Sequence, residues 1–419
     1  MVYIFFVGVN SKYKINICQI NKIDMQNYFL NLNMGIGGNQ YMKKVVILTA
    51  STGGGHNQAA RSLENVFQSH GYEVTIIDFL KVTSKMMDKI FVEGYSILSN
   101  NLPRVYKGLY KYSNYKVVNS RITNYMSKIF HKRIFKVINE INPDLIVGTH
   151  PFIVNIICKL KEKGKLLVPF ISVITDFKAH RIYVNNYVDA YITGSEYTSL
   201  SMIKKGINKE KVYTYGIPIR REFLRKSSTK TYRNNEVFTV LLMGGSMGYR
   251  AIEDVLRGLV NSKNKIKIIV VCGRNKSLME NIKVNYQNKY KNKEIIVYGF
   301  TEDIPKLMES SDLLISKPGG LTVSEAIAKR LPMLIPYMIP GQEEENAEFL
   351  AQSGVARIID DINEIDKEID GFINNQYVLK RMEKNMEKLS EDYSLDDIVR
   401  LGDKLIEKYK VYYNLKRAR

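Results

Sequence analysis

The sequence predicts an α/β protein built from two halves, each of which alternates strands with helices. Short apolar runs of the kind found in buried parallel strands recur along the chain. Most of these runs end in a glycine-rich or polar turn that leads into a helical pattern. Because parallel strands bring their carboxyl ends to one edge of a sheet, we expect these turns to face a common cleft.

The first half opens with a βαβ unit. Its strand, glycine-rich turn, helix and second strand are predicted at residues 44–49, 51–56, 59–69 and 74–78. The turn is neither a GxxxxGKS/T loop nor a GxGxxG loop, but glycines such as Gly54 and Gly55 let a ligand approach the backbone closely. His56 stands in the first turn of the helix, where it is either a catalytic base or a capping or core histidine.

The first half continues with strands that end in polar or small residues. They are predicted at residues 144–149, 170–175 and 191–193. Asp176 and His180 follow the second of these strands. They are placed either to polarise an acceptor hydroxyl and orient His56, or to cap the segment that follows them.

The second half begins after a polar, basic linker at residues 226–236. Its strands are predicted at residues 237–243, 266–272, 295–298, 313–316 and 333–336. Turns that contain glycine follow several of them. Residues 364–412 are charged and are predicted to be helical, without further strands.

One turn of the second half suits a phosphate or diphosphate group. It covers residues 317–320 and joins the strand at 313–316 to a helix predicted at 322–329. Its two glycines allow close backbone approach, and the helix start offers free N–H groups and the positive end of the helix dipole. Alternatively, Thr322 and Glu325 have the spacing of a capping box, which would make Glu325 a structural residue.

Composition limits the class of protein. The chain has 419 residues, enough for two or three domains, and its three cysteines lie far apart, so neither a disulfide framework nor a structural zinc is expected. No apolar run approaches the roughly 18 residues of a membrane span, and the start lacks the features of a signal peptide. We therefore expect a cytoplasmic protein. Residues 1–41 match no pattern, and we expect translation to begin at Met42 and the extension to lie outside the fold.

Part of the net charge of +20 is clustered in one stretch. Residues 94–139 contain no Asp or Glu, and aromatic side chains alternate there with Lys and Arg. Such a stretch binds anionic lipid headgroups or a nucleic-acid backbone, unless it only reflects an AT-rich genome. We favour a membrane surface over nucleic acid, because no nucleic-acid-binding motif occurs elsewhere. The basic residues expected to contact the membrane include Lys107, Lys111, Lys132 and Arg133.

In their order and spacing, these motifs resemble the lipid glycosyltransferase family of monogalactosyldiacylglycerol synthases and processive diacylglycerol β-glucosyltransferases. The resemblance runs from about residue 42 to the late 390s. The matching stretches are residues 48–56, 175–177 with His180, 216–220, 243–246, 298–300, 316–322 with Glu325, and 340–343 with Asn346. The same superfamily contains the transferase that adds GlcNAc to the lipid-linked peptidoglycan precursor.

The resemblance implies a GT-B fold, in which two Rossmann-like domains face a cleft and the C-terminal helix packs back on the first domain. The implied parts are an acceptor and membrane-binding domain, a nucleotide-sugar-binding domain and a returning helical segment, at residues 42–225, 237–385 and 386–419. The residues implied to bind the donor are Gly244, Gly245, Ser246, Phe300, Lys317, Gly319, Gly320, Leu321, Thr322, Glu325, Gln342, Glu343 and Asn346. In this resemblance Phe300 contacts uracil through its backbone and Glu325 holds the ribose, while Gln342 and Glu343 either face the sugar or merely begin a helix.

The implied activity is the inverting transfer of a hexose from a UDP-sugar to diacylglycerol, with glucose favoured and galactose possible, at the inner face of the cell membrane. His56 is the expected base, helped by Asp176 or His180, because all five histidines lie at or before residue 180. We expect no metal or other cofactor, since the Asp360–Asp361 pair lies outside the ligand turns. The alternatives are GlcNAc transfer to the peptidoglycan precursor, a UDP-sugar epimerase, and an inactive scaffold that binds membrane or nucleic acid. The sequence leaves the oligomeric state open.

Overall fold

The structure is a computed structural model, and it describes residues 41–51, 54–83, 102–115, 130–225, 237–244 and 251–417. The predicted extension up to residue 40, the linker at 226–236, Gly245 and Ser246 therefore lie outside the described residues, as does much of the basic stretch. Residues 43–419 form one compact unit, which contains both sheets.

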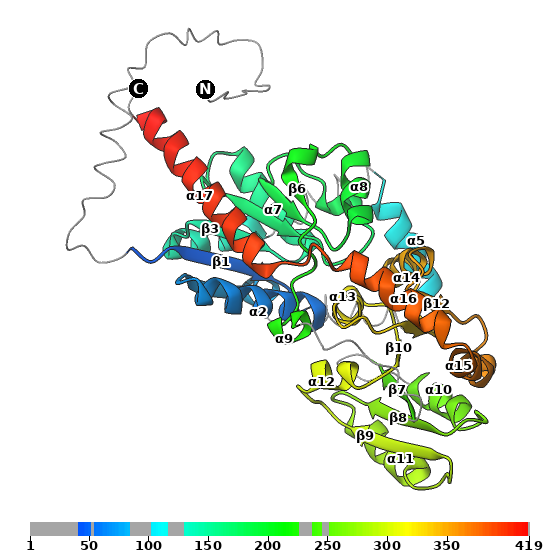
Figure 1. Cartoon of the computed structure of the whole chain (residues 1–419). Coiled ribbons are helices and arrows are strands. Elements are labelled where there is room, and N and C mark those ends of the chain that lie inside the picture. Colours follow the sequence, from blue (N-terminus) through cyan, green and yellow to red (C-terminus); the bar gives the residue numbers. More distant parts are fainter. Residues whose placement is uncertain are drawn as a thin grey trace. The chain divides into compact units, whose positions relative to one another are not determined.

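Two parallel six-stranded sheets confirm the two predicted halves (Figure 1). The first sheet has the order β2-β1-β3-β4-β5-β6. Its strands are β1 (Lys44–Thr49), β2 (Glu73–Asp78), β3 (Leu145–Gly148), β4 (Phe170–Val173), β5 (Ala190–Ile192) and β6 (Val212–Tyr213). The strand order reverses between β1 and β3, so the turns after these two strands open beside each other at the edge where ligands bind.

Helices cover both faces of the first sheet. One face packs on α2 (Gly54–Ser69) and on α17 (Leu395–Arg417), the last helix of the chain. The other face packs on α7 (Pro151–Glu162) and on helical residues 130–141. Figure 1 shows α17 lying along the first half, where Tyr409 donates a hydrogen bond of 2.7 Å to Asp189. The return of the C-terminal helix to the first domain is thus confirmed.

The second sheet has the order β12-β11-β10-β7-β8-β9. Its strands are β7 (Phe238–Met243), β8 (Ile266–Val271), β9 (Lys293–Tyr298), β10 (Leu313–Ser316), β11 (Met333–Ile335) and β12 (Ala356–Ile358). The order reverses between β7 and β10, which places the predicted phosphate-binding turn after β10 at the switch point of this sheet.

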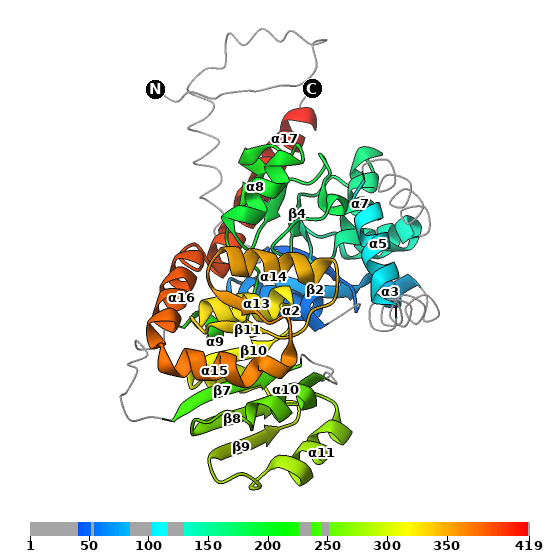
Figure 2. The same cartoon turned by 90° about the vertical axis from the view of Figure 1, so that its right-hand side faces the viewer.

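The helices of the second half form two layers around this sheet. One layer contains α10 (Ala251–Leu259), α11 (Lys276–Tyr286), α15 (Ile365–Asn374) and most of the buried residues of α16 (Gln376–Leu389). The other contains α12 (Ile304–Glu309), α13 (Gly320–Ala328) and α14 (Gln342–Gln352). Figure 2 shows α13 and α14 between the two sheets. The remaining helices are α3 (Phe79–Thr83), α5 (Pro103–Ser113), η1 (Arg181–Tyr183), α8 (Glu196–Lys204), η2 (Lys209–Lys211), α9 (Arg221–Leu224) and η3 (Ile362–Glu364).

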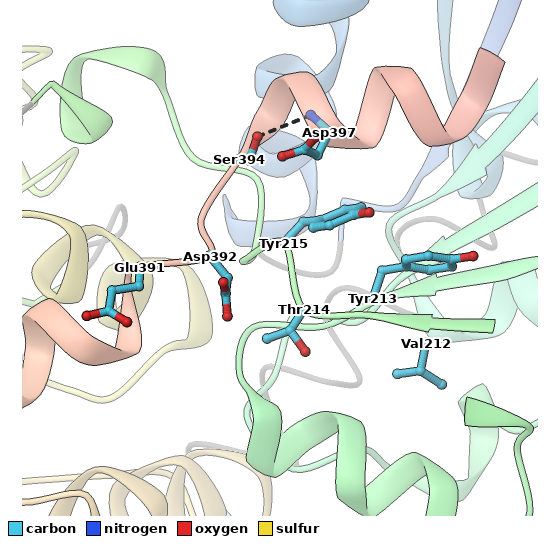
Figure 3. Close-up of a pocket in the computed structure, with 8 residues that line it drawn as sticks. All are labelled: Val212, Tyr213, Thr214, Tyr215, Glu391, Asp392, Ser394 and Asp397. Atoms are coloured by element: carbon cyan, nitrogen blue, oxygen red, sulfur yellow. Dashed lines mark hydrogen bonds between the residues drawn. The ribbon is translucent and has the colours of Figure 1, made fainter. Parts of the chain in front are cut away.

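The chain segments after β6 and between α16 and α17 run side by side. The Ser394 amide donates to the Tyr215 carbonyl over 3.0 Å, and the Tyr393 ring packs against Gly216. Gly216 has a φ of +83°, and a Cβ there would lie 2.7 Å from that ring, so only glycine fits. A cavity of about 410 Å³ opens beside this crossing (Figure 3). Its lining, residues 212–215, 391, 392, 394 and 397, includes none of the predicted site residues.

Candidate active site

His56 lies in the first turn of α2, directly after the turn that follows β1. Its Nδ1 is 2.8 Å from the carbonyl oxygen of Thr149 and 3.2 Å from the hydroxyl oxygen of Thr175. Because a carbonyl oxygen can only accept, Nδ1 carries the proton and Nε2 keeps a free lone pair. Burial lowers the pKa of His56 to about 4, so the ring is neutral near pH 7. The arrangement provides a base with its acceptor nitrogen already defined.

The His150 ring supports the His56 ring. The two ring centroids are 4.6 Å apart in an edge-to-face arrangement. His150 precedes α7, and its Nδ1 accepts a hydrogen bond of 3.3 Å from the Phe152 amide. Local sequence patterns do not reveal Thr149, His150 or Thr175 as partners of His56. Only their positions point to the site, because all three follow the carboxyl ends of β3 and β4.

Asp176 is buried against α14. Its carboxylate accepts hydrogen bonds from the side chains of Gln342 and Asn346. Burial raises the pKa of Asp176 to about 6, although these two hydrogen bonds lower it. The alternative that Asp176 caps the segment after it is wrong, since its recorded partners belong to α14.

His180 caps η1, the segment that follows it, which confirms the capping alternative for this residue, and its other ring nitrogen contacts α5. Nδ1 accepts from the Ile182 amide over 3.2 Å, and Nε2 donates to the Tyr110 carbonyl over 3.3 Å. The recorded hydrogen bonds therefore assign the orientation of His56 to Thr149 and Thr175, and not to Asp176 or His180 as expected. A role for Asp176 or His180 towards an acceptor hydroxyl stays a prediction.

The turn after β10 leads into α13 two residues earlier than predicted. Gly319 precedes the helix, and no side chain caps it. Thr322 lies inside the first turn, so the capping-box explanation of Glu325 is wrong. The Glu325 carboxyl group is buried, which raises its pKa to about 8, while the positive charge of Arg220 lowers it. A buried acidic group at the edge of the cleft suits ligand hydroxyl groups, which can hydrogen-bond to it.

The two glycines of this turn have different surroundings. A Cβ at Gly320 would lie 1.9 Å from the Thr175 carbonyl oxygen, so the second half touches the end of β4 here and has room only for glycine. A Cβ at Gly319 would meet nothing within 4 Å. The backbone at Gly319 is therefore open to close approach, as a phosphate site requires.

The first residues of α14 form hydrogen bonds and ion pairs with segments of both halves. Gln342 and Glu343 are its first residues, and Glu343 forms an ion pair of 2.7 Å with Lys317. Asn346 accepts a hydrogen bond from the Phe177 amide over 2.9 Å and donates one to the Pro318 carbonyl over 3.0 Å. One side chain thus joins the turn after β4 to the turn after β10. Their contact with the sugar stays a prediction.

The other predicted residues lie around the same junction. Gly54 and Gly55 begin α2, and a Cβ at Gly55 would lie 3.8 Å from Leu321 of α13. The first turns of the two helices therefore face each other across the junction. In the second half, Gly244 follows β7 and Phe300 follows β9, where its ring is exposed beneath the guanidinium of Arg274.

Helix α5 exposes large apolar side chains on its outward side. Val105, Leu109 and Tyr112 of the helix are exposed, as are Leu102 and Tyr115 just beyond its ends. Its inward side carries Tyr106, Lys107 and Tyr110, and Lys107 forms an ion pair of 2.7 Å with Glu344 of α14. Lys111, Lys132 and Arg133 are exposed. In a water-soluble domain an amphipathic helix turns its apolar face to the core, so this outward face indicates contact with something apolar. Within the described part of the chain, no helix combines the length and apolarity that crossing a bilayer needs.

Comparison with known proteins divides the chain at the same place as the two sheets. Residues 56–219 match the family model of monogalactosyldiacylglycerol (MGDG) synthase, and residues 239–398 match that of the glycosyltransferase family 28 C-terminal domain. The chain is 30% identical over 385 residues to the processive diacylglycerol beta-glucosyltransferase of Bacillus pumilus (strain SAFR-032), covering 88% of this chain and 98% of that protein. It is 30% identical over 382 residues to the enzyme of the same name from Bacillus subtilis (strain 168), with the same coverage.

Among solved structures, Acinetobacter baumannii MurG superposes with a TM-score of 0.61 at 16% identity, covering 86% of this chain and 99% of that one. At this identity the likeness concerns the fold alone.

Proposed function

Because the chain belongs to the family of processive diacylglycerol β-glucosyltransferases and has the GT-B fold, we propose that it transfers a hexose from a UDP-sugar to the hydroxyl group of diacylglycerol. Glucose is the favoured sugar, since the curated relatives are named for it, and galactose is the second candidate. The observation that carries the proposal is that Thr175 contacts both His56 and Gly320, so the histidine and the N-terminus of α13 share one neighbour at the junction of the two halves.

The donor binds to the second half in this proposal. Its diphosphate lies over Gly319 and the first N–H groups of α13, and Lys317 adds a positive charge beside them. The ribose hydroxyls hydrogen-bond to the buried carboxyl group of Glu325 in α13. Gly244 and Phe300, which follow β7 and β9 on the two sides of β8, border the nucleoside.

The acceptor reacts beside His56. The diacylglycerol hydroxyl oxygen forms a bond to the anomeric carbon as the bond from that carbon to the phosphate oxygen breaks. The hydroxyl proton passes to Nε2 of His56, and the electron pair leaves with UDP. The negative charge that develops on UDP is stabilised by the N-terminus of α13 and by Lys317. Attack from the face opposite UDP inverts the anomeric carbon and makes a β-glycoside.

The reaction needs no metal ion in this proposal, since the helix start and Lys317 supply the positive charge that a divalent cation gives in other transferases. The UDP-sugar is a substrate, and no cofactor takes part in this proposal.

Diacylglycerol reaches the site from a membrane surface. The apolar outer face of α5 enters the interfacial region of the bilayer, and Lys111, Lys132 and Arg133 meet anionic headgroups. The association is peripheral, at the inner face of the cell membrane. Lys107 contributes less to it, because it is paired with Glu344.

A radiolabel assay tests the function. The purified protein receives labelled UDP-glucose, UDP-galactose or UDP-GlcNAc, with diacylglycerol in anionic vesicles and the lipid-linked peptidoglycan precursor offered in parallel. We expect the label in diacylglycerol, from UDP-glucose above all, and chromatography then counts the sugars added. Label only in the precursor would assign the chain to cell-wall synthesis. No label in either acceptor would leave an inactive scaffold.

A further inference from the structure

The inner face of α5 joins the two halves of the molecule. Tyr110 donates a hydrogen bond of 2.9 Å to Glu345, and Lys107 pairs with Glu344, so this face reaches the first turn of α14. On the other side, Asn114 accepts a hydrogen bond of 2.9 Å from the Arg181 amide, which belongs to the turn after β4. Figures 1 and 2 both show α5 beside α14.

Tyr110 is the centre of this contact. Its ring occupies the space against Gly341, where a Cβ would lie 3.1 Å away, and Gly341 has a φ of +96°. Its carbonyl oxygen accepts from His180, and the two rings are 4.9 Å apart. Burial raises the pKa of Tyr110, and the neighbouring carboxylate of Glu345 raises it further, so the hydroxyl remains a donor at all relevant pH. The Tyr110 hydroxyl therefore keeps its proton and can donate to Glu345 whenever α5 packs on α14.

The first turn of α14 carries three consecutive carboxylates, and each has a cation from a different segment. Glu343 pairs with Lys317 of the donor turn, and Glu344 pairs with Lys107 of α5. Glu345 pairs with Lys178, which follows β4, over 3.0 Å. Three adjacent negative charges repel one another unless such partners are present. Lys107 and Tyr110 of α5 thus contribute, with Lys178 and Lys317, to stabilising this turn of α14.

The same turn of α14 carries Gln342 and Asn346, which hold Asp176, Phe177 and Pro318. A displacement of α5 would thus be transmitted through Glu344 and Glu345 to the turn that receives the diphosphate. The outer face of the same helix is the apolar face assigned above to the bilayer.

We propose that α5 couples membrane docking to closure of the UDP-sugar site, with Tyr110 and Lys107 as the positioning residues. The inference rests on the proposed function, because it takes the diacylglycerol-bearing membrane as the docking partner. Contact with the bilayer holds α5 in the orientation that presents Tyr110 to Glu345 and Lys107 to Glu344. The donor turn then stays closed, and UDP is bound more tightly on the membrane than in solution.

The test measures UDP affinity by calorimetry, with and without saturating anionic vesicles that contain no diacylglycerol. For the unaltered protein we expect UDP to bind at least about fivefold more tightly on the vesicles, within the range usual for coupled sites. By reciprocity, UDP strengthens vesicle binding by the same factor. Equal UDP affinity in the two conditions would overturn the proposal without reference to any variant.

Matched variants of α5 identify the residues responsible. Tyr110→Phe and Lys107→Gln remove the two contacts to α14, and we expect the affinity ratio to fall towards one while binding to vesicles persists. Tyr187→Phe and Lys163→Gln make the same changes at exposed positions outside α5 and should keep the ratio. If Tyr110→Phe does not fold, Glu345→Gln weakens the same contact from α14. A ratio that survives in the Tyr110→Phe, Lys107→Gln double variant would refute these residues as the coupling device.

The readout separates this inference from the proposed function. UDP affinity and vesicle binding are measured without any transfer. If UDP binds more tightly on vesicles but no glycolipid forms, only the proposed transfer to diacylglycerol is contradicted. Normal product formation with a ratio of one would contradict only the coupling.

Discussion

Nδ1 of His56 donates its proton to the carbonyl oxygen of Thr149 over 2.8 Å, which leaves Nε2 as the basic atom of the ring. A backbone carbonyl has no alternative protonation state, so this bond holds one tautomer. We propose that an acceptor hydroxyl delivers its proton to Nε2.

Replacing His56 with alanine should slow transfer by about 10²–10⁴-fold, the usual contribution of a general base. UDP affinity should stay close to that of the unaltered protein, because His56 belongs to the first half and not to the donor turn. The control is His70→Ala, which removes a histidine at the far end of the same helix and should leave transfer unchanged. An equal loss of transfer and UDP affinity would make His56 a structural residue.

The titration of His56 should be displaced to low pH. Burial lowers its pKa from 6.5 to about 4, so the unfolded chain binds this proton more readily than the folded one between these values. The group therefore reduces stability as the pH falls through this range and has no such effect above about 6.5. NMR spectra of ring protons, assigned by comparison with His56→Gln, measure the value directly. A midpoint between 6 and 7 would contradict the buried, neutral imidazole described here.

Glu325→Gln should weaken UDP binding at pH 7 by about 2–10-fold, since the hydrogen bonds of a neutral carboxyl group contribute about 0.5–1.5 kcal/mol each. Without UDP, the variant should be at least as stable as the unaltered protein near pH 8. The carboxyl group has its pKa raised from 4.5 to about 8, so the folded chain binds the proton more readily, and stability falls as the pH rises through this range. Thermal melting and calorimetry check both parts, with the exposed Glu348→Gln as the control. UDP affinity unchanged by Glu325→Gln would remove Glu325 from the donor site.

The strands that build the cleft were predictable because they are buried on both faces and end in recognisable turns. The sequence predicts β10 at residues 313–316, where the structure has it. In contrast, β6 and β12 have only two and three residues at the outer edges of the sheets, too few for an apolar pattern. The capping-box explanation of Glu325 failed because α13 already begins at Gly320, which places Thr322 inside the first turn instead of at the cap.

Contacts across the junction could not be predicted from local patterns. Tyr110 and Glu345 are separated by 235 positions, and neither belongs to a recognisable motif with the other. The sequence reveals the basic, aromatic stretch. It does not reveal which side of the helix in that stretch faces the protein. The structure turns Lys107 inward to Glu344 and leaves Leu109 outside. The prediction that Lys107 contacts the membrane is revised because its side chain pairs with Glu344 of the second half, a contact that the local sequence does not reveal.

Transfer should proceed unchanged in EDTA, and added Mg²⁺ should not accelerate it. The helix N-terminus at Gly320 and the ammonium group of Lys317 provide the positive charge for the departing diphosphate. Lys317→Gln should therefore lower the rate of transfer in EDTA, whereas loss of metal should not. A rate that collapses in EDTA and returns with Mg²⁺ would show that a cation does this work.

The anomeric configuration of the product tests the central claim most directly, namely that a diacylglycerol hydroxyl activated by His56 displaces UDP in one step. The protein is incubated with ¹³C-labelled UDP-glucose and diacylglycerol in anionic vesicles, and the extracted lipid is examined by NMR. The account predicts a β-linked glucosyl-diacylglycerol, which is absent when His56→Ala replaces the unaltered protein. An α-linked glycolipid, or labelled free glucose without glycolipid, would contradict it.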